Sequence, residues 1–432
     1  MKLQNSTSKK TKHDHAVFTI WRLKLLWSLV VGCWSFSAVA ADWPQFLGPT
    51  RNGLSTETNL AVSWPAEGPK TIWQTNIGQG FSGPVVAQGK LILFHRLDDQ
   101  ETIDCLDAKN GKPLWRFQYP THYQDDFGFD EGPRGTPAIS EGKVYTMGAE
   151  GVVTCLDFST GKKIWSVPAQ EEFHAGKGFF GMVCSPLVEG DVVILSIGGQ
   201  PGAGIVAFDK LTGKLRWKKT DDEAGYSSPA SATINGTREA LVFTRAGLVG
   251  LSPITGLVYF NFPWRSRQDA SVNAAVPLVS SNQVFITASY GTGAALLKLD
   301  GNKVEKLWSS DDTLSSHYAT SILQDGFLYG MHGRTDPGFS PAALRCVEWA
   351  TGKVLWSEAI GPSTVTFADG QLLLMTEKGE LLRVEASPKK FQQTAHAQIL
   401  GAGVRAYPAL ADGLFYARSK TKLICVELSK AK

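Results

Sequence analysis

The chain has 432 residues, with 43 Lys and Arg against 40 Asp and Glu, a formal net charge of +3. The first forty residues hold six basic residues and Asp14, a net charge of +5, so the remainder carries about −2. A chain with this balance lacks the basic surface that nucleic-acid binding requires, and we expect no nucleic-acid partner.

Residues 1–40 are predicted to be a signal peptide. The basic residues come first, Leu25 to Phe36 form an apolar stretch too short to cross a bilayer comfortably, and Ala38 to Ala40 supply the small residues of a cleavage site. The sequence therefore predicts an exported protein, periplasmic or extracellular.

A second interpretation of the leader stays open. Val30 to Cys33 resembles a lipobox, which would leave an acylated Cys33 as a membrane anchor. Membrane contact is expected only in that case.

After an N-terminal extension over 41–69, one phrase recurs along residues 70–429. Its fullest copy runs from Ala207 to Trp217. The acidic position of the copies falls at Asp107, Asp157, Asp209, Ser252, Asp300, Glu348, Glu385 and Glu427. The repeat is about 46 residues long, which predicts an all-β, eight-bladed β-propeller with four-stranded antiparallel blades.

The phrase has a physical interpretation. A strand ends at the acid, a Thr-Gly turn follows in which glycine accepts a left-handed backbone, and the next strand carries a tryptophan. The expected structural docking residues are Asp107, Gly111, Trp115, Asp157, Gly161, Trp165, Asp209, Gly213, Trp217, Trp308, Gly352 and Trp356.

The two ends of the repeat region complement each other. Lys422 to Leu428 supplies a third strand with no fourth strand after it, and Lys70 to Thr75 resembles that missing strand. We therefore expect the N- and C-terminal strands to pair and close the ring, which leaves no free edge. A closed ring is one domain, and the expected state is a monomer.

Cysteines follow the repeat as well. Cys105, Cys155, Cys346 and Cys425 stand two residues before the acid, where another copy has Ala207. Disulfides or a metal site are one interpretation in an exported protein. The favoured interpretation is small buried packing residues under the tryptophans, because equivalent positions on successive blades are too far apart for a disulfide.

One local motif suggests a nucleotide site. Gly176 to Gly181 fits G-x-G-x-x-G, but no strand precedes it and no helix follows. We expect this loop to place Phe179 and Phe180 at the channel mouth or under a neighbouring blade. No zinc or haem spacing occurs, so no metal site is predicted.

The repeated phrase resembles the tryptophan-docking motif of the PQQ-type propellers, which include the quinoprotein alcohol dehydrogenases and the outer-membrane assembly lipoprotein BamB. Trp43 to Pro49 and Gly225 to Pro229 are similar to a secreted bacterial family of PQQ-binding-like repeat proteins. The resemblance implies the fold and an envelope location.

The resemblance also raises PQQ as a cofactor. Quinoprotein dehydrogenases typically carry an adjacent cysteine pair, acidic and amide ligands for calcium, a catalytic aspartate and long insertions over the site. This chain has no adjacent cysteines and its repeats are short. The favoured hypothesis is a non-catalytic cell-envelope scaffold without a cofactor. The alternative is a PQQ- and calcium-dependent, or other small-molecule, oxidoreductase.

The long connecting loops gather on one face of the predicted propeller, and function often lies on such loops. The candidate binding residues there are Tyr226, Arg265, Arg267, Asn273, Tyr290, His317, Tyr318 and Arg334. They could simply satisfy loop carbonyls and pair with nearby aspartates. They could instead form a shallow pocket for an envelope protein segment, an acidic peptide, or a small anionic or sugar-like ligand.

Overall fold

The computed structural model describes residues 42–269, 271–334 and 342–430. The predicted signal peptide and Cys33 lie outside the described residues. No helix within the described ranges is long and apolar enough to span a membrane.

Blades 1 to 4 each consist of four consecutive strands. Blade 1 contains β2 (Val85–Ala87), β3 (Lys90–Leu97), β4 (Gln100–Asp107) and β5 (Pro113–Pro120). Blade 2 contains β6 (Ala138–Ser140), β7 (Lys143–Met147), β8 (Val152–Asp157) and β9 (Lys163–Pro168), followed by α1 (Ala169–Glu172). Blade 3 contains β10 (Leu187–Glu189), β11 (Val192–Gly199), β12 (Ala203–Asp209) and β13 (Leu215–Lys219). Blade 4 contains β14 (Ala230–Ile234), β15 (Thr237–Phe243), β16 (Gly247–Leu251) and β17 (Val258–Pro263).

Blades 5 to 8 continue the same order. Blade 5 contains β18 (Leu278–Ser280), β19 (Gln283–Ala288), β20 (Gly293–Asp300) and β21 (Lys303–Ser310). Blade 6 contains β22 (Ile322–Gln324), β23 (Phe327–His332), β24 (Ala343–Glu348) and β25 (Val354–Glu358). Blade 7 contains β26 (Ser363–Ala368), β27 (Gln371–Thr376), β28 (Glu380–Glu385) and β29 (Gln393–Gln398). Blade 8 contains β30 (Ala409–Ala411), β31 (Leu414–Arg418), β32 (Lys422–Glu427) and, as its outer strand, β1 (Thr71–Asn76).

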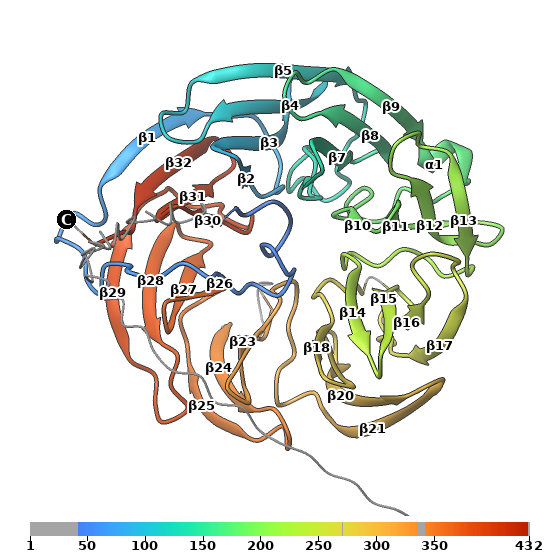
Figure 1. Cartoon of the computed structure of the whole chain (residues 1–432). Helices are drawn as coiled ribbons and strands as arrows, with labels where there is room; N and C mark the ends of the chain where they lie inside the picture. Colours follow the sequence, from blue (N-terminus) through green and yellow to red (C-terminus); the bar gives the residue numbers. More distant parts are fainter. Residues whose placement is uncertain (1–41, 270, 335–341, 431–432) are drawn as a thin grey trace, which may run out of the picture. The chain divides into compact units, whose positions relative to one another are not determined.

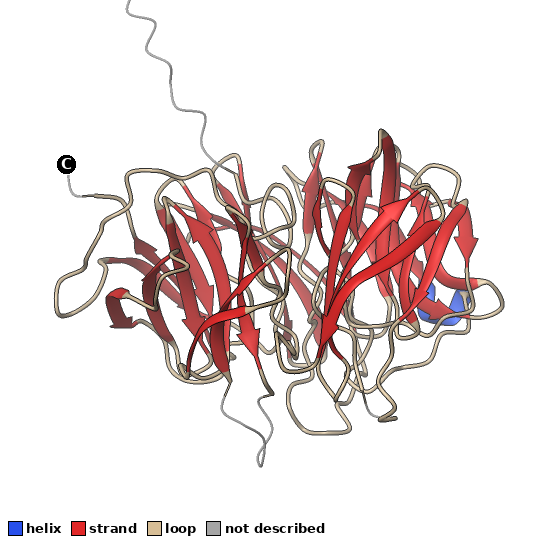
Figure 2. Cartoon of the chain, turned by 90° about the horizontal axis from the view of Figure 1, so that it is seen from below, coloured by secondary structure: helices blue, strands red, loops and turns tan. Residues whose placement is uncertain are grey.

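The predicted eight-bladed propeller is confirmed. Every blade is an antiparallel sheet whose strands run in order from the central channel to the rim, and the blades follow one another around a ring (Figure 1). Strands make up nearly all of the regular structure, and the short helix α1 lies at the periphery (Figure 2).

The ring closes as the sequence predicts. Strand β1 pairs antiparallel with β32, with Trp73 opposite Cys425 and Gln74 opposite Ile424. The chain's first strand thus completes its last blade, and both terminal edges are paired.

Tryptophans on six of the eight outer strands join a blade to the next. The Trp165 indole N–H donates to the Lys210 carbonyl at 3.1 Å, and the ring packs on Gly213 of blade 3, where a Cβ would lie 2.7 Å away. Gly213 also has φ +70°, so a side chain there is excluded by both the backbone and the indole. The same indole-to-carbonyl bond is made by Trp73, Trp115, Trp217, Trp308 and Trp356.

The acidic residue holds the turn that presents this carbonyl. The Asp209 carboxylate accepts hydrogen bonds from the Leu211 and Thr212 backbone N–H groups at 3.1 and 2.9 Å. Two copies lack the tryptophan: β17 carries Phe260 and β29 carries Gln393 at that position.

The cysteines lie where the packing interpretation places them. Cys105, Cys155, Cys346 and Cys425 are buried free thiols. Cys105 and Cys155 stand opposite Trp115 and Trp165 in the strand register. Burial raises the pKa of Cys105 and Cys155 to about 12, so neither thiol forms a thiolate at neutral pH.

The N-terminal extension runs through the central channel (Figure 1), which the sequence did not predict. We call residues 42–60 the strap. Trp43 exchanges two backbone hydrogen bonds of 2.8 Å with Val86 of blade 1, and the Pro44 carbonyl accepts from Ile139 N of blade 2 at 2.7 Å.

Further along, the strap reaches the remaining blades. Arg51 donates to the Pro186 and Ser185 carbonyls of blade 3 at 2.7 and 2.9 Å. Leu47 packs in a cluster with residues of blades 4, 5 and 8, namely Ala230, Val276 and Tyr407. Gly53 lies against Ile322 of blade 6, and Ser55 N donates to Phe367 O of blade 7 at 2.8 Å. The strap therefore contacts all eight blades.

Replacing one docking tryptophan tests the contact between blades. Trp217 is 8% exposed, so Trp217→Ala should lower the free energy of unfolding by about 3–5 kcal/mol. Trp217→Phe keeps a ring but leaves the Pro253 carbonyl without its donor, and should cost about 1–2 kcal/mol. Urea denaturation followed by circular dichroism measures both. Leu211→Ala, at a residue 52% exposed in the same blade, is the control, and an equal loss in it would contradict the docking role.

A buried histidine on β3, His95, holds the link between β1 and β2 through Gly78. His95 Nδ1 accepts from Gly78 N at 2.8 Å, so Nε2 carries the proton and donates to Asp104 Oδ2 at 3.0 Å. This arrangement requires the neutral ring. Burial lowers the pKa of His95 below its usual value of 6.5, against the opposing pull of Asp104.

This histidine predicts a dependence of stability on pH. Because its pKa is lower in the folded chain, His95 contributes stability that is present above pH 6.5 and is lost as pH falls through the folded pKa. The urea midpoint should fall more steeply on acidification in the wild type than in His95→Gln. His174→Gln, at an exposed position, should keep the wild-type slope. Identical slopes for all three proteins would refute the prediction.

Candidate functional site, an aromatic bowl over the channel

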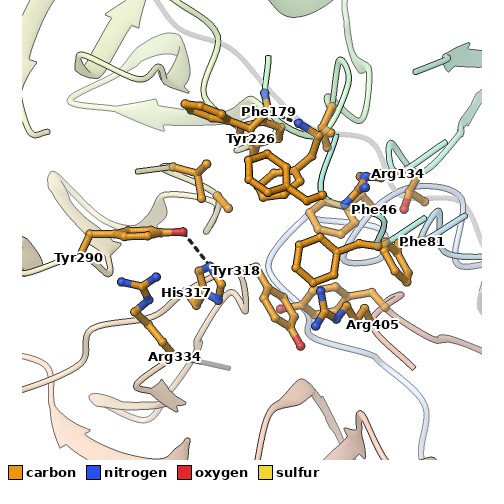
Figure 3. A pocket seen from close by; sticks show the side chains of 18 residues that line it. Phe46, Phe81, Arg134, Phe179, Tyr226, Tyr290, His317, Tyr318, Arg334 and Arg405 are labelled. Carbon is orange, nitrogen blue, oxygen red and sulfur yellow. Dashed lines mark hydrogen bonds between the residues drawn. The ribbon is translucent and has the colours of Figure 1, made fainter. Parts of the chain in front are cut away.

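A cavity of about 370 Å³ lies on the face that carries the long loops (Figure 3). We call it the bowl. Its lining residues come from the strap, from seven connections between blades and from two loops within blades, and ten of the eighteen are aromatic. They are Phe46, Phe81, Phe127, Phe129, Arg134, Thr136, Phe179, Phe180, Val183, Tyr226, Val272, Ala274, Tyr290, His317, Tyr318, Arg334, Arg405 and Tyr407.

The strap supplies part of the bowl's wall. Phe46 meets Tyr407 edge-on with ring centroids 5.2 Å apart. The Tyr407 hydroxyl accepts from Thr320 N at 2.5 Å and donates to Thr320 O at 3.3 Å, which fixes the ring. The bowl is therefore a depression above a filled channel.

Four phenylalanines from two loops form an aromatic cluster on one side. Phe127 and Phe129 contact Phe180 with centroids 5.2 and 5.9 Å apart, and Phe179 lies 6.3 Å from Phe127. Phe127 and Phe129 are 53% and 39% exposed. Large apolar side chains at this exposure mark a surface suited to binding an apolar group.

The loop with the dinucleotide-like glycines has a different function from phosphate binding. Its Phe179 and Phe180 N–H groups both donate to the Tyr226 hydroxyl, at 2.7 and 3.0 Å. Gly178 has φ +70°, and a Cβ there would lie 2.8 Å from the same hydroxyl. The glycine thus lets the loop close on Tyr226, and the two phenylalanines line the bowl, as the sequence predicts.

Two arginines stack on the aromatic rings and are paired with acids. Arg134 lies 5.2 Å from both the Phe81 and Phe180 ring centroids and bonds Asp125 at 2.9 Å. Arg405 lies 5.4 Å from the Phe129 centroid and bonds Glu377 at 2.9 Å. The charge of each guanidinium is therefore largely compensated next to the bowl.

The opposite side of the bowl is polar. The Tyr290 hydroxyl lies 2.9 Å from His317 Nε2, and the Arg334 guanidinium lies 4.1 Å from the centre of the Tyr290 ring (Figure 3). Next to them, the Tyr318 hydroxyl donates to Glu377 Oε1 at 2.7 Å. Burial raises the pKa of Tyr318 well above its usual value, so this phenol is a neutral donor at physiological pH.

The structure divides the predicted site residues into three groups. Five line the bowl together: Tyr226, Tyr290, His317, Tyr318 and Arg334. Arg265 and Arg267 line a second hollow that also includes Tyr290. Asn273 is 4% exposed, and its amide donates to the Thr244 and Trp264 carbonyls at 2.9 and 3.0 Å, which is the loop-satisfying role left open above. A binding role for these residues stays a prediction.

Sequence reasoning named Phe179 and Phe180 but did not select the other four phenylalanines that line the bowl. Phe46 belongs to the strap and Phe81 to the segment after β1, both far in sequence from the loops considered. Phe127 and Phe129 flank a glycine in a long loop, and two exposed aromatics so close together were a usable signal.

The described lining residues do not fit a calcium-bound PQQ centre. Calcium takes six to eight oxygen ligands, largely carboxylates and amides, yet none of the residues that line the bowl is Asp, Glu, Asn or Gln. Throughout the described part of the chain, no three His, Cys, Asp or Glu side chains form a group that could hold a metal ion.

Comparisons with known proteins agree with the fold. Residues 99–338 match the profile of a family described as outer membrane protein assembly factor BamB. BamB of Burkholderia pseudomallei (strain K96243) is 23% identical over 320 residues, which cover 71% of this chain and 74% of that protein.

Dehydrogenases of the same fold match as well. The dehydrogenase subunit of the quinone alcohol dehydrogenase of Komagataeibacter europaeus is 24% identical over 331 residues, covering 68% of this chain but only 43% of that subunit. The quinohemoprotein alcohol dehydrogenase of Comamonas testosteroni has a solved structure that superposes with a TM-score of 0.63 at 16% identity, covering 91% of this chain and 81% of that one. This likeness shows the fold alone.

Removing the hydroxyl that holds the 176–181 loop tests how the bowl is built. Tyr226→Phe leaves two backbone N–H groups without their acceptor, so amide hydrogen exchange at Phe179 and Phe180 should rise about tenfold or more. Exchange in the inner strands should not change. Tyr259→Phe, on the outer strand β17, is the matched control. Unchanged exchange in the loop would show that other contacts hold it.

Proposed function

Because the chain belongs to the family described as outer membrane protein assembly factor BamB, we propose that it is a non-catalytic binding protein of the cell envelope. The bowl is its binding site. The observation that carries this proposal is the combination of ten aromatic rings with three arginines and no carboxylate in one lining.

The chemistry of the lining favours one kind of ligand. Phenylalanine rings bury an apolar body, whereas the side with Arg334 and His317 suits an anionic group. A neutral sugar would need hydrogen-bond acceptors for its many hydroxyl donors. The lining has no carboxylate or side-chain amide, so its side-chain acceptors are limited to hydroxyl oxygens and a histidine nitrogen. An anion with an aromatic or apolar body therefore fits better than a polyhydroxylated one.

The arrangement of titratable groups supports binding over catalysis. An active site typically gathers an acid and a base with shifted pKa values in its cleft. In the bowl, burial raises the pKa of Tyr226, Tyr318 and Tyr407, but these phenols already hold structural hydrogen bonds. Burial raises the pKa of Glu101 to about 7, but this carboxylate accepts from Ala149 N at 2.7 Å and does not line the bowl. The lining residues themselves offer no carboxylate as a general base.

Anilinonaphthalene sulfonate, an aromatic anion, is a direct probe of the bowl. We expect saturable binding by fluorescence that weakens with added salt, because part of it is charge-assisted. Phe180→Ala and Arg334→Ala should each weaken it about tenfold, since each removes one of the two kinds of contact. Arg216→Ala, on the outer strand β13, is the matched arginine control and should bind as the wild type does.

The enzymatic alternative has its own readout in the same preparation. Adding PQQ and calcium should give no alcohol oxidation. Alcohol oxidation that requires both additions would replace this proposal with the quinoprotein one. Probe binding that Phe180→Ala and Arg334→Ala leave unchanged would show that the bowl is not the site.

A further inference from the structure

A second hollow adjoins the bowl across a single ring. Its volume is about 500 Å³, and its lining comes from the β17–β18 connection and the β19–β20 turn. The lining residues are Pro263, Trp264, Arg265, Arg267, Gln268, Tyr290, Gly291 and Thr292. Tyr290 lines both cavities and is the residue at which they meet.

The two cavities differ in charge. Beside the bowl, Arg134 and Arg405 are each paired with an acid, at 2.9 Å in both cases. In the second hollow, Arg265 and Arg267 are exposed, and neither makes an ion pair with another residue of the described chain. No described residue that lines this hollow is acidic. Uncompensated positive charge therefore lies on the far side of Tyr290 from the aromatic cluster.

We propose that the natural ligand of this face is an acidic peptide segment that lies across Tyr290. This inference rests on the proposed function of the bowl and deepens it. An apolar side chain of the segment occupies the bowl, and carboxylates that follow it in the segment reach Arg265 and Arg267. Arginine forks match carboxylates in geometry and charge.

A peptide fits the observations better than an acidic polysaccharide. A polysaccharide presents similar rings along its length, whereas the bowl and the hollow demand different groups: one is lined by phenylalanines and the other by arginines.

Two matched peptides test the inference on the full chain. One blocked heptapeptide carries a phenylalanine followed, after two glycines, by two aspartates, and the other has asparagines in place of the aspartates. By calorimetry the acidic peptide should bind about tenfold more tightly, and this advantage should shrink as salt is added. In Arg265→Gln/Arg267→Gln the two peptides should bind within about twofold of each other.

The outcomes separate this inference from the function on which it rests. The double variant should bind anilinonaphthalene sulfonate as the wild type does, because that probe occupies the bowl alone, while Phe180→Ala should weaken both peptides. Equal binding of the two peptides by a wild type that still binds the probe would overturn the inference and leave the bowl's function standing. Oligogalacturonate binding that depends on Arg265 and Arg267, with no binding of the acidic peptide, would assign the face to a polysaccharide instead. Loss of probe binding would overturn the proposed function itself.

Discussion

The hydrogen bond from a tryptophan indole to a carbonyl of the next blade is the contact on which the ring depends. It joins two sheets that share no strand, and the glycine beneath the indole lets the ring approach the turn, as Gly213 does under Trp165. Because Trp73 on the first strand makes the same bond to Ala108, the blade that closes the ring is held to blade 1 as five other blades are held to their neighbours. The closed ring has no terminal repeat at which unfolding can begin at low cost.

The strap determines what kind of site this ring can carry. An open channel would admit a ligand between the inner strands, but residues 42–60 occupy that space and contact every blade. Arg51 shows how tightly they fit: it is 4% exposed, and burial lowers its pKa to about 10. The proposed binding site therefore lies at the rim of the channel, where Phe46 of the strap forms part of the wall.

The same propeller supports dehydrogenases and assembly factors among the relatives, so the fold alone does not decide the function. The loops decide it. Here they bring phenylalanines and compensated arginines to the bowl, and uncompensated arginines to the neighbouring hollow. This gradient from apolar to positive across Tyr290 is the physical basis on which we propose a ligand with an apolar end and an acidic end.

The sequence by itself determined the number of blades, the closure of the ring and the packing role of the cysteines, because each follows from a repeat of about 46 residues whose tryptophan, glycine and acid recur in register. It also indicated the face that carries the bowl, and Tyr226, Tyr290, His317, Tyr318 and Arg334 all line it. Only the tertiary structure decided the direction of each loop side chain. The Asn273 amide points inward and donates to two backbone carbonyls, whereas the Tyr226 hydroxyl accepts from the Phe179 N–H and also lines the bowl. No periodic pattern in the sequence distinguishes these two orientations. The course of the strap could not be predicted from the sequence either. Its partners lie in eight blades spread along the whole chain, and a contact between distant segments leaves no local pattern.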